Sequence, residues 1–578
     1  MKRISGILAA TVALCSLCAV DLHAFQAPAG VSLPRIEQRG AVKQLVVDGK
    51  PFVMLAGELH NSSASSVEYM QPIWDRLQHL NLNTVVSTVS WELLEPEEGK
   101  FDYTLVDAQI EEARKHGLRL VLIWFGAWKN GESTYAPMWV KSNHERFPVQ
   151  LRKPRPASVR TSAPPRAQRD APLSPFSLAT MSADARAYKA LIHHLKERDP
   201  LHTVVMVQVE NELGLLGDSR DRSTLADAAW AKPVPQELTA YLSKNKDHLL
   251  PETAELWAAN GYKTTGTWSE VFGTNEWAEE AFMAWHYALF VQRVVSEGKA
   301  EMNLPMYVNA WLGPQPGAPL PGDWPTGGPV ARVTDIWRAA APAIDLYAPD
   351  IYVDDFKGTT DLYTRSGNPL FIPEARDQAG NLFWALGRHA ALGWSVFGVD
   401  DLSPDGQIAK SYRTLEGILP QLPEWQSQGK VSAALLVEGQ ESETTELGGY
   451  KITVSKPPRR GGAASSTEIL PQLQAGGVAA GSRALPADTR PFCLVVNTSA
   501  DEFVILGSNV AATFALLSEG KSLASIGSID EGHFENGRWI AGRRLNGDEG
   551  RLILQPMQWN SKAETLTAVK VRLYRSSQ

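Results

Sequence analysis

The sequence predicts an α/β fold, a (β/α)₈ TIM barrel followed by a C-terminal all-β, sandwich-like domain. From about residue 45, short apolar runs alternate with longer amphipathic stretches, which is the pattern of repeated βα units. Beyond about Leu419 the helical periodicity fades, and short apolar runs divided by turn residues follow. A chain of 578 residues is also too long for one compact core, so at least two domains are expected.

Eight short apolar runs are the predicted barrel strands, and segments with apolar residues at three-to-four spacing are the predicted helices. The strands are Phe52–Leu59, Thr84–Ser90, Leu118–Phe125, Thr203–Val209, Pro305–Ala310, Ile344–Tyr352, Pro369–Pro373 and Gly393–Val399. The helices include Glu68–His79, Val106–His116, Ala183–Glu197, Trp277–Ser296 and Leu382–Ala391.

Three parts are expected along the chain: a signal peptide over residues 1–24, the catalytic barrel over 25–418, and a β-rich accessory domain over 419–578. Two insertions interrupt the barrel. The segment 151–179 is dense in Pro, Arg, Ser and Ala, which favours a surface insertion. The segment 215–268 carries enough apolar residues to fold over the barrel mouth.

The N-terminus is typical of an export signal, with Lys2 and Arg3 before an apolar run and the small Ala24 near a cleavage point. An exported protein, periplasmic or secreted, is therefore expected, without stable membrane insertion after signal removal. Leu22 is large for a cleavage site, so an uncleaved anchor is the alternative. Cleavage leaves Cys493 as the single thiol, which excludes an internal disulfide.

The amino-acid composition indicates which classes of molecule the protein binds. The net charge of −8 repels phosphate backbones, so nucleic acid is excluded as a partner. The 18 Trp residues favour carbohydrate, because indole rings stack on the apolar faces of sugars.

Two glutamates mark the predicted active site. Glu212 and Glu374 follow the fourth and seventh predicted strands, where barrel enzymes place their chemistry. Facing carboxylates suit glycoside hydrolysis, one as general acid and the other as nucleophile, and a separation of about 5–5.5 Å predicts retention. Arg376 is expected to keep Glu374 ionised. For either glutamate alone, a surface ion pair at a strand end is the alternative.

The motif Gln208-Val209-Glu210-Asn211-Glu212-Leu213-Gly214 resembles the signature of glycoside hydrolase family 35, the β-galactosidases of clan A, with Leu213 in place of the usual Tyr. The segment Trp91-Glu92-Leu93-Leu94-Glu95-Pro96 is similar to that family's loop after strand two. The resemblance implies that Glu212 is the acid/base, that Glu374 is the nucleophile, and that Asn211 binds the sugar 2-hydroxyl. The C-terminal part resembles the β-rich domain of a bacterial subgroup, some of whose members act on xyloglucan.

The galactose-contacting residues of the family are partly changed. The loop after strand three has Gly126-Ala127-Trp128-Lys129 where the family shows Ala-Glu-Trp, and Thr88 stands where a sugar-contacting Tyr is common. Lys129, Glu58 and Glu92 are therefore expected to take over polar contacts with the substrate.

Other predicted substrate-binding residues lie at strand ends. Asn309 ends strand five, and Tyr352 ends strand six, where related clan A enzymes place a Tyr that hydrogen bonds the nucleophile. Trp128 and Trp394 are expected to form a sugar platform. For Tyr352, Trp128 and Trp394 alike, core packing is the alternative.

No metal and no cofactor are expected. The twelve His residues show no His-Glu-x-x-His motif, and no phosphate-binding glycine loop lies at a strand–helix junction. The predicted function is a retaining exo-β-galactosidase that acts on plant-type oligosaccharides, with xyloglucan side chains among the candidates. The alternatives are a retaining enzyme for another sugar, such as a glucoside, mannoside or glucosaminide, and a non-catalytic carbohydrate-binding barrel.

Overall fold

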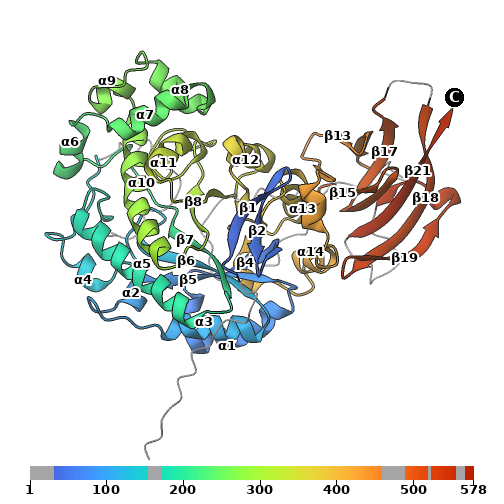
Figure 1. Ribbon diagram of the computed structural model, residues 1–578, viewed down its shortest axis with the longest axis horizontal. Helices are drawn as coiled ribbons and strands as arrows, with labels where there is room; N and C mark the ends of the chain where they lie inside the picture. The colour runs from blue at the N-terminus through green and yellow to red at the C-terminus, as the bar shows by residue number, and fades with distance from the viewer. Residues whose placement is uncertain (1–31, 154–170, 458–487, 519–521, 555–565, 578) are drawn as a thin grey trace, which may run out of the picture.

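The computed structural model describes residues 32–153, 171–457, 488–518, 522–554 and 566–577 (Figure 1). The predicted signal peptide, and residues 154–170 of the first predicted insertion, lie outside this part. Helices surround a sheet through most of the chain, and the C-terminal strands form a separate β-rich lobe (Figure 1). Within the described ranges, no helix is both long and apolar enough to cross a bilayer.

Eight parallel strands form one sheet in the order β10-β11-β4-β5-β6-β7-β8-β9. Beyond the ends of β9 and β10, Ile351 and Ala375 make a further parallel bridge, and the Ile351 N–H donates to the Glu374 carbonyl at 2.9 Å. The bridge brings the two outer strands together, so the predicted TIM barrel is confirmed. The strands are β4 Met54–Glu58, β5 Thr84–Ser90, β6 Arg119–Lys129, β7 Val204–Asn211, β8 Met306–Trp311, β9 Leu346–Asp350, β10 Phe371–Ile372 and β11 Gly393–Phe397.

A compact apolar cluster fills the barrel interior, with members such as Ala56, Ile123 and Phe371 from different strands. Leu45 and Val47, from an N-terminal hairpin, join the same cluster. The hairpin immediately precedes β4, so it packs where the strands begin and leaves the opposite end for the site. Its strands are β1 Arg35–Arg39, β2 Val42–Val47 and β3 Lys50–Pro51.

Helix α1 shows how an outer helix buries one apolar face against the strands. In α1, the Ser66 hydroxyl caps the N-terminus by accepting from the Tyr69 N–H, and Ile73, Trp74 and Leu77 are buried at helical spacing. The helices around the barrel are α1 Val67–Gln78, α2 Trp91–Leu94, α3 Thr104–Lys115, α4 Met138–Lys141, α5 Leu178–Arg198, α10 Glu276–Glu301, α11 Thr334–Ala340, α12 Phe356–Tyr363, α13 Ala379–Arg388, α14 Gln407–Glu416 and α15 Leu422–Ser427.

Four further helices lie mostly within the predicted insertion 215–268. They group beside α10 and α11 in Figure 1. Asp335 of α11 accepts a hydrogen bond from the Leu250 N–H at 2.6 Å, so the group is fixed to the outer helices. The four are α6 Thr224–Trp230, α7 Gln236–Lys244, α8 Pro251–Ala258 and α9 Trp268–Phe272.

The C-terminal strands form two antiparallel sheets, in the orders β12-β15-β16-β21-β18-β19 and β13-β14-β17-β20. Tyr450 and Ile452 of one sheet share a core with Val495 and Ile505 of the other, so the predicted sandwich is present. Cys493 lies in this core, where burial raises the pKa of its thiol to about 12. The strands are β12 Val431–Leu435, β13 Ser442–Leu447, β14 Tyr450–Ser455, β15 Phe492–Ser499, β16 Glu502–Ser508, β17 Val510–Leu516, β18 Ser522–Glu535, β19 Arg538–Leu545, β20 Ile553–Leu554 and β21 Thr567–Ser577.

Helix α13 joins the barrel to the sandwich. Its Phe383 ring lies 5.0 Å from the ring of Phe492 at the start of β15. The buried Asp488 carboxylate accepts from the Gly380 N–H at 2.9 Å and from Arg490, whose guanidinium also donates to Asn381. The two units therefore share both apolar and polar contacts.

Candidate active site

Glu212 and Glu374 meet at the end of the barrel where the strands finish. Glu212 directly follows β7, and Glu374 lies two residues beyond β10. One oxygen of each carboxylate lies within 4.8 Å of the other and of an Asp350 oxygen. Both glutamates are buried apart from a small exposed fraction, 7% for Glu212 and 5% for Glu374. The pair is thus close together and still open to a ligand.

Two neutral donors approach Glu374. The Tyr352 hydroxyl donates to one carboxylate oxygen at 3.0 Å, and the Asn211 amide donates to the other at 3.3 Å. Burial and then the Glu374 charge raise the pKa of Tyr352, so this phenol stays protonated and remains a donor. A donor on each oxygen fixes the orientation of the Glu374 carboxyl group, as the attacking group of a covalent mechanism requires.

Lys129 reaches the site from β6. Its ammonium donates to the Asn211 side-chain carbonyl at 2.8 Å, which leaves the Asn211 amide directed at Glu374. The side chain is 8% exposed and lies 5.1 Å from the centre of the Phe125 ring. Lys129, which the sequence predicts to contact substrate, therefore lies beside the carboxylates, and its one hydrogen bond to a side chain among the described residues goes to Asn211.

Asn309 connects Glu212 with Asp350. Its side-chain carbonyl accepts from the Glu212 N–H at 2.9 Å, and its amide donates to Asp350 at 2.7 Å. Asn309 is fully buried, so its role is to orient these two residues.

Glu58 lies beneath the pair at the end of β4, wholly buried. Neither of its carboxylate oxygens finds a hydrogen-bond partner among the described residues. Burial, with the charge of Glu374 as the next cause, raises the pKa of Glu58 well above its usual range. Glu58 is wholly buried and so does not make the predicted sugar contact, and its raised pKa favours the neutral form of this carboxyl group beside the nucleophile.

Asp350 and Tyr307 belong to the same buried group. Burial and the Glu374 charge raise the pKa of Asp350, and burial raises that of Tyr307. The sequence indicated only weakly that Asp350 belongs to the site, because a carboxylate ends the sixth predicted strand. Tyr307 was not predicted. The feature that could have identified Tyr307 is a tyrosine within an apolar strand, two residues before Asn309 and therefore on the same inward face of the strand.

The predicted tryptophan platform is wrong. Trp128 is fully buried, donates its ring N–H to the Leu173 carbonyl at 3.0 Å and packs edge-on against Phe290. Trp394 is also fully buried, in the cluster between the strands and the helices. Neither ring presents a face to a sugar, because both fill the outer layer of the core.

Arg376 does not contact Glu374. Its guanidinium pairs with Asp354 at 3.4 Å, so the residue next-but-one to the nucleophile faces away from it. The cation that affects the buried carboxyl groups is instead Lys129. Its charge lowers the pKa of both Glu58 and Asp350, although burial raises both pKa values by more.

A wide bulge in β6 supports Lys129. Trp124 pairs with Val209 and Lys129 pairs with Asn211, so residues 125–128 of β6 stand opposite Glu210 alone. Glu210 and Glu212 both adopt positive φ, 61° and 42°. Such strain in non-glycine residues costs about 1–3 kcal/mol each and is concentrated at functional sites.

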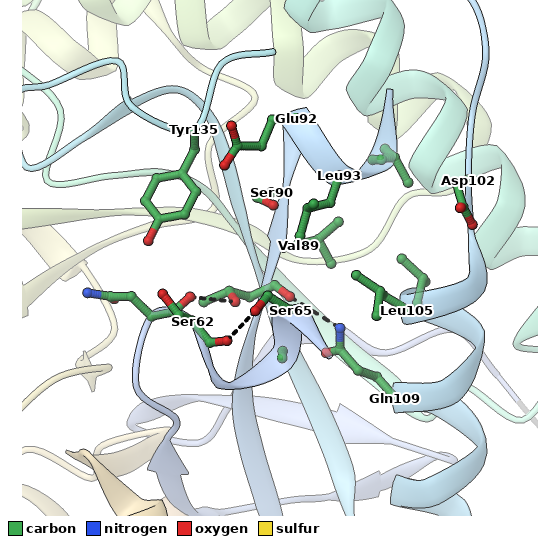
Figure 2. A pocket seen from close by; sticks show the side chains of 15 residues that line it. Ser62, Ser65, Val89, Ser90, Glu92, Leu93, Asp102, Leu105, Gln109 and Tyr135 are labelled. Carbon is green, nitrogen blue, oxygen red and sulfur yellow. Dashed lines mark hydrogen bonds between the residues drawn. The ribbon is translucent and has the colours of Figure 1, made fainter. Parts of the chain in front are cut away.

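A separate cavity of about 330 Å³ opens beside the loops that follow β4, β5 and β6 (Figure 2). Its lining includes Asn61, Ser90, Glu92, Leu93 and Tyr135. Glu92, which was predicted to contact substrate, lines this cavity, and its carboxylate is paired with Lys141 at 3.1 Å.

The three carboxylates of Glu212, Asp350 and Glu374 are the group in the described part of the chain with the spacing of metal ligands. Of these three groups, Asp350 has its pKa lowered by the charge of Lys129, against the larger effect of burial. The absence of a metal requirement stays a prediction.

An eight-stranded parallel barrel with two close carboxylates after its fourth and seventh strands has the fold and site of a barrel glycoside hydrolase. Residues 62–292 match the model of glycoside hydrolase family 42, described as beta-galactosidase. Residues 408–557 match a model described as a domain of unknown function, DUF5597. The chain therefore contains a β-galactosidase-like glycoside hydrolase domain, and the model that matches is family 42, not the family 35 that the motifs resemble.

A beta-galactosidase of Xanthomonas manihotis is 31% identical over 228 residues, which make up 36% of this chain and 32% of that protein. The chain thus spans about a third of the length of this curated relative. Among solved structures, the beta-galactosidase of the psychrophilic Marinomonas ef1 is 12% identical (TM-score 0.38; 63% of this chain, 59% of that one). The cold-adapted beta-galactosidase of Rahnella sp. R3 is 15% identical (TM-score 0.42; 64% and 57%), and the beta-amylase catalytic domain of Paenibacillus polymyxa is 12% identical (TM-score 0.39; 61% and 93%).

Proposed function

We propose that the protein is a retaining exo-β-galactosidase. The observation that carries the proposal is the approach of Glu212 and Glu374 to within 4.8 Å at the barrel mouth. Retaining glycosidases hold their carboxyl groups about 5–5.5 Å apart, whereas inverting ones leave about 6.5–9.5 Å for a water molecule. The observed spacing favours the retaining geometry.

In the proposed reaction, Glu374 attacks the anomeric carbon while Glu212 gives its proton to the departing glycosidic oxygen. The sugar is then bonded to Glu374. Glu212, now ionised, removes a proton from water, the water oxygen attacks the anomeric carbon, and the Glu374 carboxylate leaves. Asn211 is the proposed contact for the 2-hydroxyl, and its hydrogen bond to the nucleophile supports this role.

Galactose as the sugar is supported by the match of residues 62–292 to the family 42 model, which is described as beta-galactosidase. Plant-type oligosaccharides, including galactosylated xyloglucan, are the proposed natural substrates. Export to the periplasm or the medium belongs to the same proposal and rests on the N-terminal sequence.

A panel of nitrophenyl β-glycosides tests the sugar. The β-galactoside should have the highest kcat/KM; preference for a glucoside, mannoside or glucosaminide would reassign the substrate, and an inert wild type would favour a carbohydrate-binding barrel.

Alanine variants of the two glutamates test the roles. Glu374→Ala and Glu212→Ala should each lower kcat by about 1,000-fold or more, because each removes a reacting group. Azide should rescue Glu374→Ala with the α-galactosyl azide and Glu212→Ala with the β-galactosyl azide. The same anomer from both variants would contradict the assignment.

A further inference from the structure

We infer that the cavity in Figure 2 is a subsite for a neutral sugar unit of the leaving group, on the catalytic face of the barrel; this inference rests on the proposed function. Its volume of about 330 Å³ lies at the small end of ligand pockets, about 300–1,000 Å³, and suits a single sugar unit.

The cavity lies on the same face as the catalytic pair. Asn61 and Ser62 follow β4, Ser90 ends β5, and Tyr135 lies in the loop after β6, so three successive strand ends contribute to it. Because the strands are parallel, these ends meet at the mouth that also holds Glu212.

A short chain of contacts joins the cavity to the reacting groups. The Tyr135 ring lies 4.7 Å from the Phe125 ring, and the Lys129 ammonium lies 5.1 Å from that same ring. Lys129 in turn donates to Asn211, which donates to Glu374. The wall of the cavity is thus separated from the nucleophile by three side chains.

The lining identifies the ligand class. None of the fifteen described residues that line the cavity is Lys, Arg or His, whereas Glu92 and Asp102 are acidic, which disfavours phosphate, sulfate and uronic acid groups. In Figure 2, Glu92 and Tyr135 lie on one side of the cavity and Gln109 on the other, with serines between them. Hydroxyl, amide and carboxylate groups around exposed apolar carbon match the alternating hydroxyl and C–H surface of a sugar.

Leu93 forms part of the apolar wall of the cavity, and its replacement by Ala tests the inference. It is 40% exposed and lines the cavity, so its truncation removes sugar contact without opening the core. The control is Leu201→Ala, a leucine that is 37% exposed and precedes β7, at the opposite end of the barrel.

The experiment measures kcat/KM for nitrophenyl β-galactoside and for a galactosylated xyloglucan oligosaccharide. In Leu93→Ala, the ratio of the oligosaccharide value to the aryl value should fall about 3- to 10-fold, and Leu201→Ala should leave the ratio unchanged. An unchanged ratio in Leu93→Ala would overturn the subsite. A wild type that hydrolyses neither compound would instead overturn the proposed function.

A second inference comes from a different observation, the buried carboxyl groups of Asp184 on α5 and Glu210 on β7, both with no exposed surface. The geometry points to an acid–carboxylate pair that shares one proton and positions Lys129. The two carboxyl groups meet at one backbone donor, the Ala127 N–H, which lies 3.2 Å from an oxygen of each, and burial raises the pKa of both.

The pair holds the bulge of β6 through its backbone. Glu210 accepts from the Trp128 N–H at 2.7 Å, and the Ala127 N–H is shared between Glu210 and Asp184 at 3.2 Å to each. Asp184 also accepts from the Trp124 indole at 2.7 Å. These bonds fix the residues just before Lys129, so they determine whether its ammonium reaches Asn211.

Loss of the shared proton would leave two adjacent buried charges, which repel strongly in a medium of low dielectric constant. The other titratable groups that face the pair are Glu95 with its partner Arg186, Tyr188 on α5, and Tyr287 on α10. We therefore expect the bulge to loosen and activity to fall at alkaline pH.

Glu210→Gln keeps a donor for Asp184 and an acceptor for Trp128 but cannot ionise. It should retain activity within about 3-fold, whereas Glu210→Ala should lower kcat about 10- to 100-fold. The decisive readout is the alkaline limb of kcat/KM with dinitrophenyl β-galactoside, whose leaving group needs no acid from Glu212. That limb should move to higher pH in Glu210→Gln.

The matched control is Glu280→Gln, another carboxyl with no exposed surface, which accepts from the Trp324 indole at 2.9 Å away from the bulge. Its alkaline limb should coincide with that of the wild type. An unmoved limb in Glu210→Gln would overturn the positioning role, even where Glu210→Ala fails to fold.

Discussion

At the residue scale, the two side chains that donate hydrogen bonds to Glu374 differ in their exposure to solvent. Tyr352 is 36% exposed and touches one carboxylate oxygen, whereas the buried Asn211 touches the other. Tyr352 can therefore contact both the nucleophile and the bound sugar, while Asn211 is held in place by Lys129.

Tyr352→Phe removes only the hydroxyl that donates to Glu374. We expect kcat to fall about 10- to 100-fold, because one hydrogen bond to a charged group contributes about 1.5–3 kcal/mol. Steady-state kinetics with nitrophenyl β-galactoside checks this. A kcat equal to that of the wild type would show that the hydroxyl does not orient the nucleophile during turnover.

Glu58→Gln tests the neutral state of the buried Glu58. The raised pKa means that the folded state keeps a proton that the unfolded chain loses above about pH 4.3, so the free energy of unfolding falls as pH rises through that value. The variant removes this titration. Its stability relative to the wild type should therefore be constant below about pH 4 and should increase above it, by about 1.4 kcal/mol per unit of raised pKa.

Thermal unfolding of both proteins between pH 4 and pH 7 measures this difference. A difference in Tm that stays constant over the whole range would mean that Glu58 is ionised in the folded protein.

The sequence located Glu212 and Glu374 because apolar strands run directly into acids at the two strand ends. It could not orient the tryptophans, since an apolar ring after a strand faces a sugar or a helix according to packing that the local pattern does not record. The partner of Glu210 was also hidden, because Asp184 lies on a helix beyond the insertion and nothing in its own sequence context distinguishes it.

At the scale of elements, the β6 bulge is the feature that departs most from a regular barrel strand. Apolar periodicity predicted the strand as far as Phe125, and the structure continues it to Lys129. The extension depends on buried carboxyl groups that accept backbone N–H bonds, an arrangement that hydrophobic patterning does not detect.

Gly126 lies inside the bulge, where a Cβ atom would come within 2.7 Å of Glu210 Oε1 and 2.8 Å of Asp184 Oδ1. Gly126→Ala should lower the free energy of unfolding by about 1–3 kcal/mol, because two buried carboxyl groups would have to move. Denaturant unfolding measures the loss. A midpoint equal to that of the wild type would mean that the bulge admits a Cβ atom without displacing the two carboxyl groups.

At the scale of the whole molecule, the barrel and the sandwich are joined by α13 and by the buried carboxylate of Asp488. Its side chain accepts from Gly380 on one side and is paired with Arg490 on the other. No described residue of the sandwich is among those placed at the carboxylate pair.

Asp488→Ala leaves the Gly380 N–H and the Arg490 guanidinium without their carboxylate. We expect a loss of about 3–5 kcal/mol in the unfolding transition that separates the two units, as for other broken buried ion pairs. Calorimetry checks this: one transition should shift or split, and superimposable thermograms would show that the junction contributes little.

The proposed mechanism requires Glu374 to become covalently bonded to the sugar, and trapping that intermediate is the sharpest test of it. The protein is incubated with an activated 2-deoxy-2-fluoro-β-galactoside, digested and analysed by mass spectrometry. We expect one fluorogalactosyl group, on the peptide that contains Glu374. A label on another residue, or no label from an enzyme that hydrolyses β-galactosides, would contradict it.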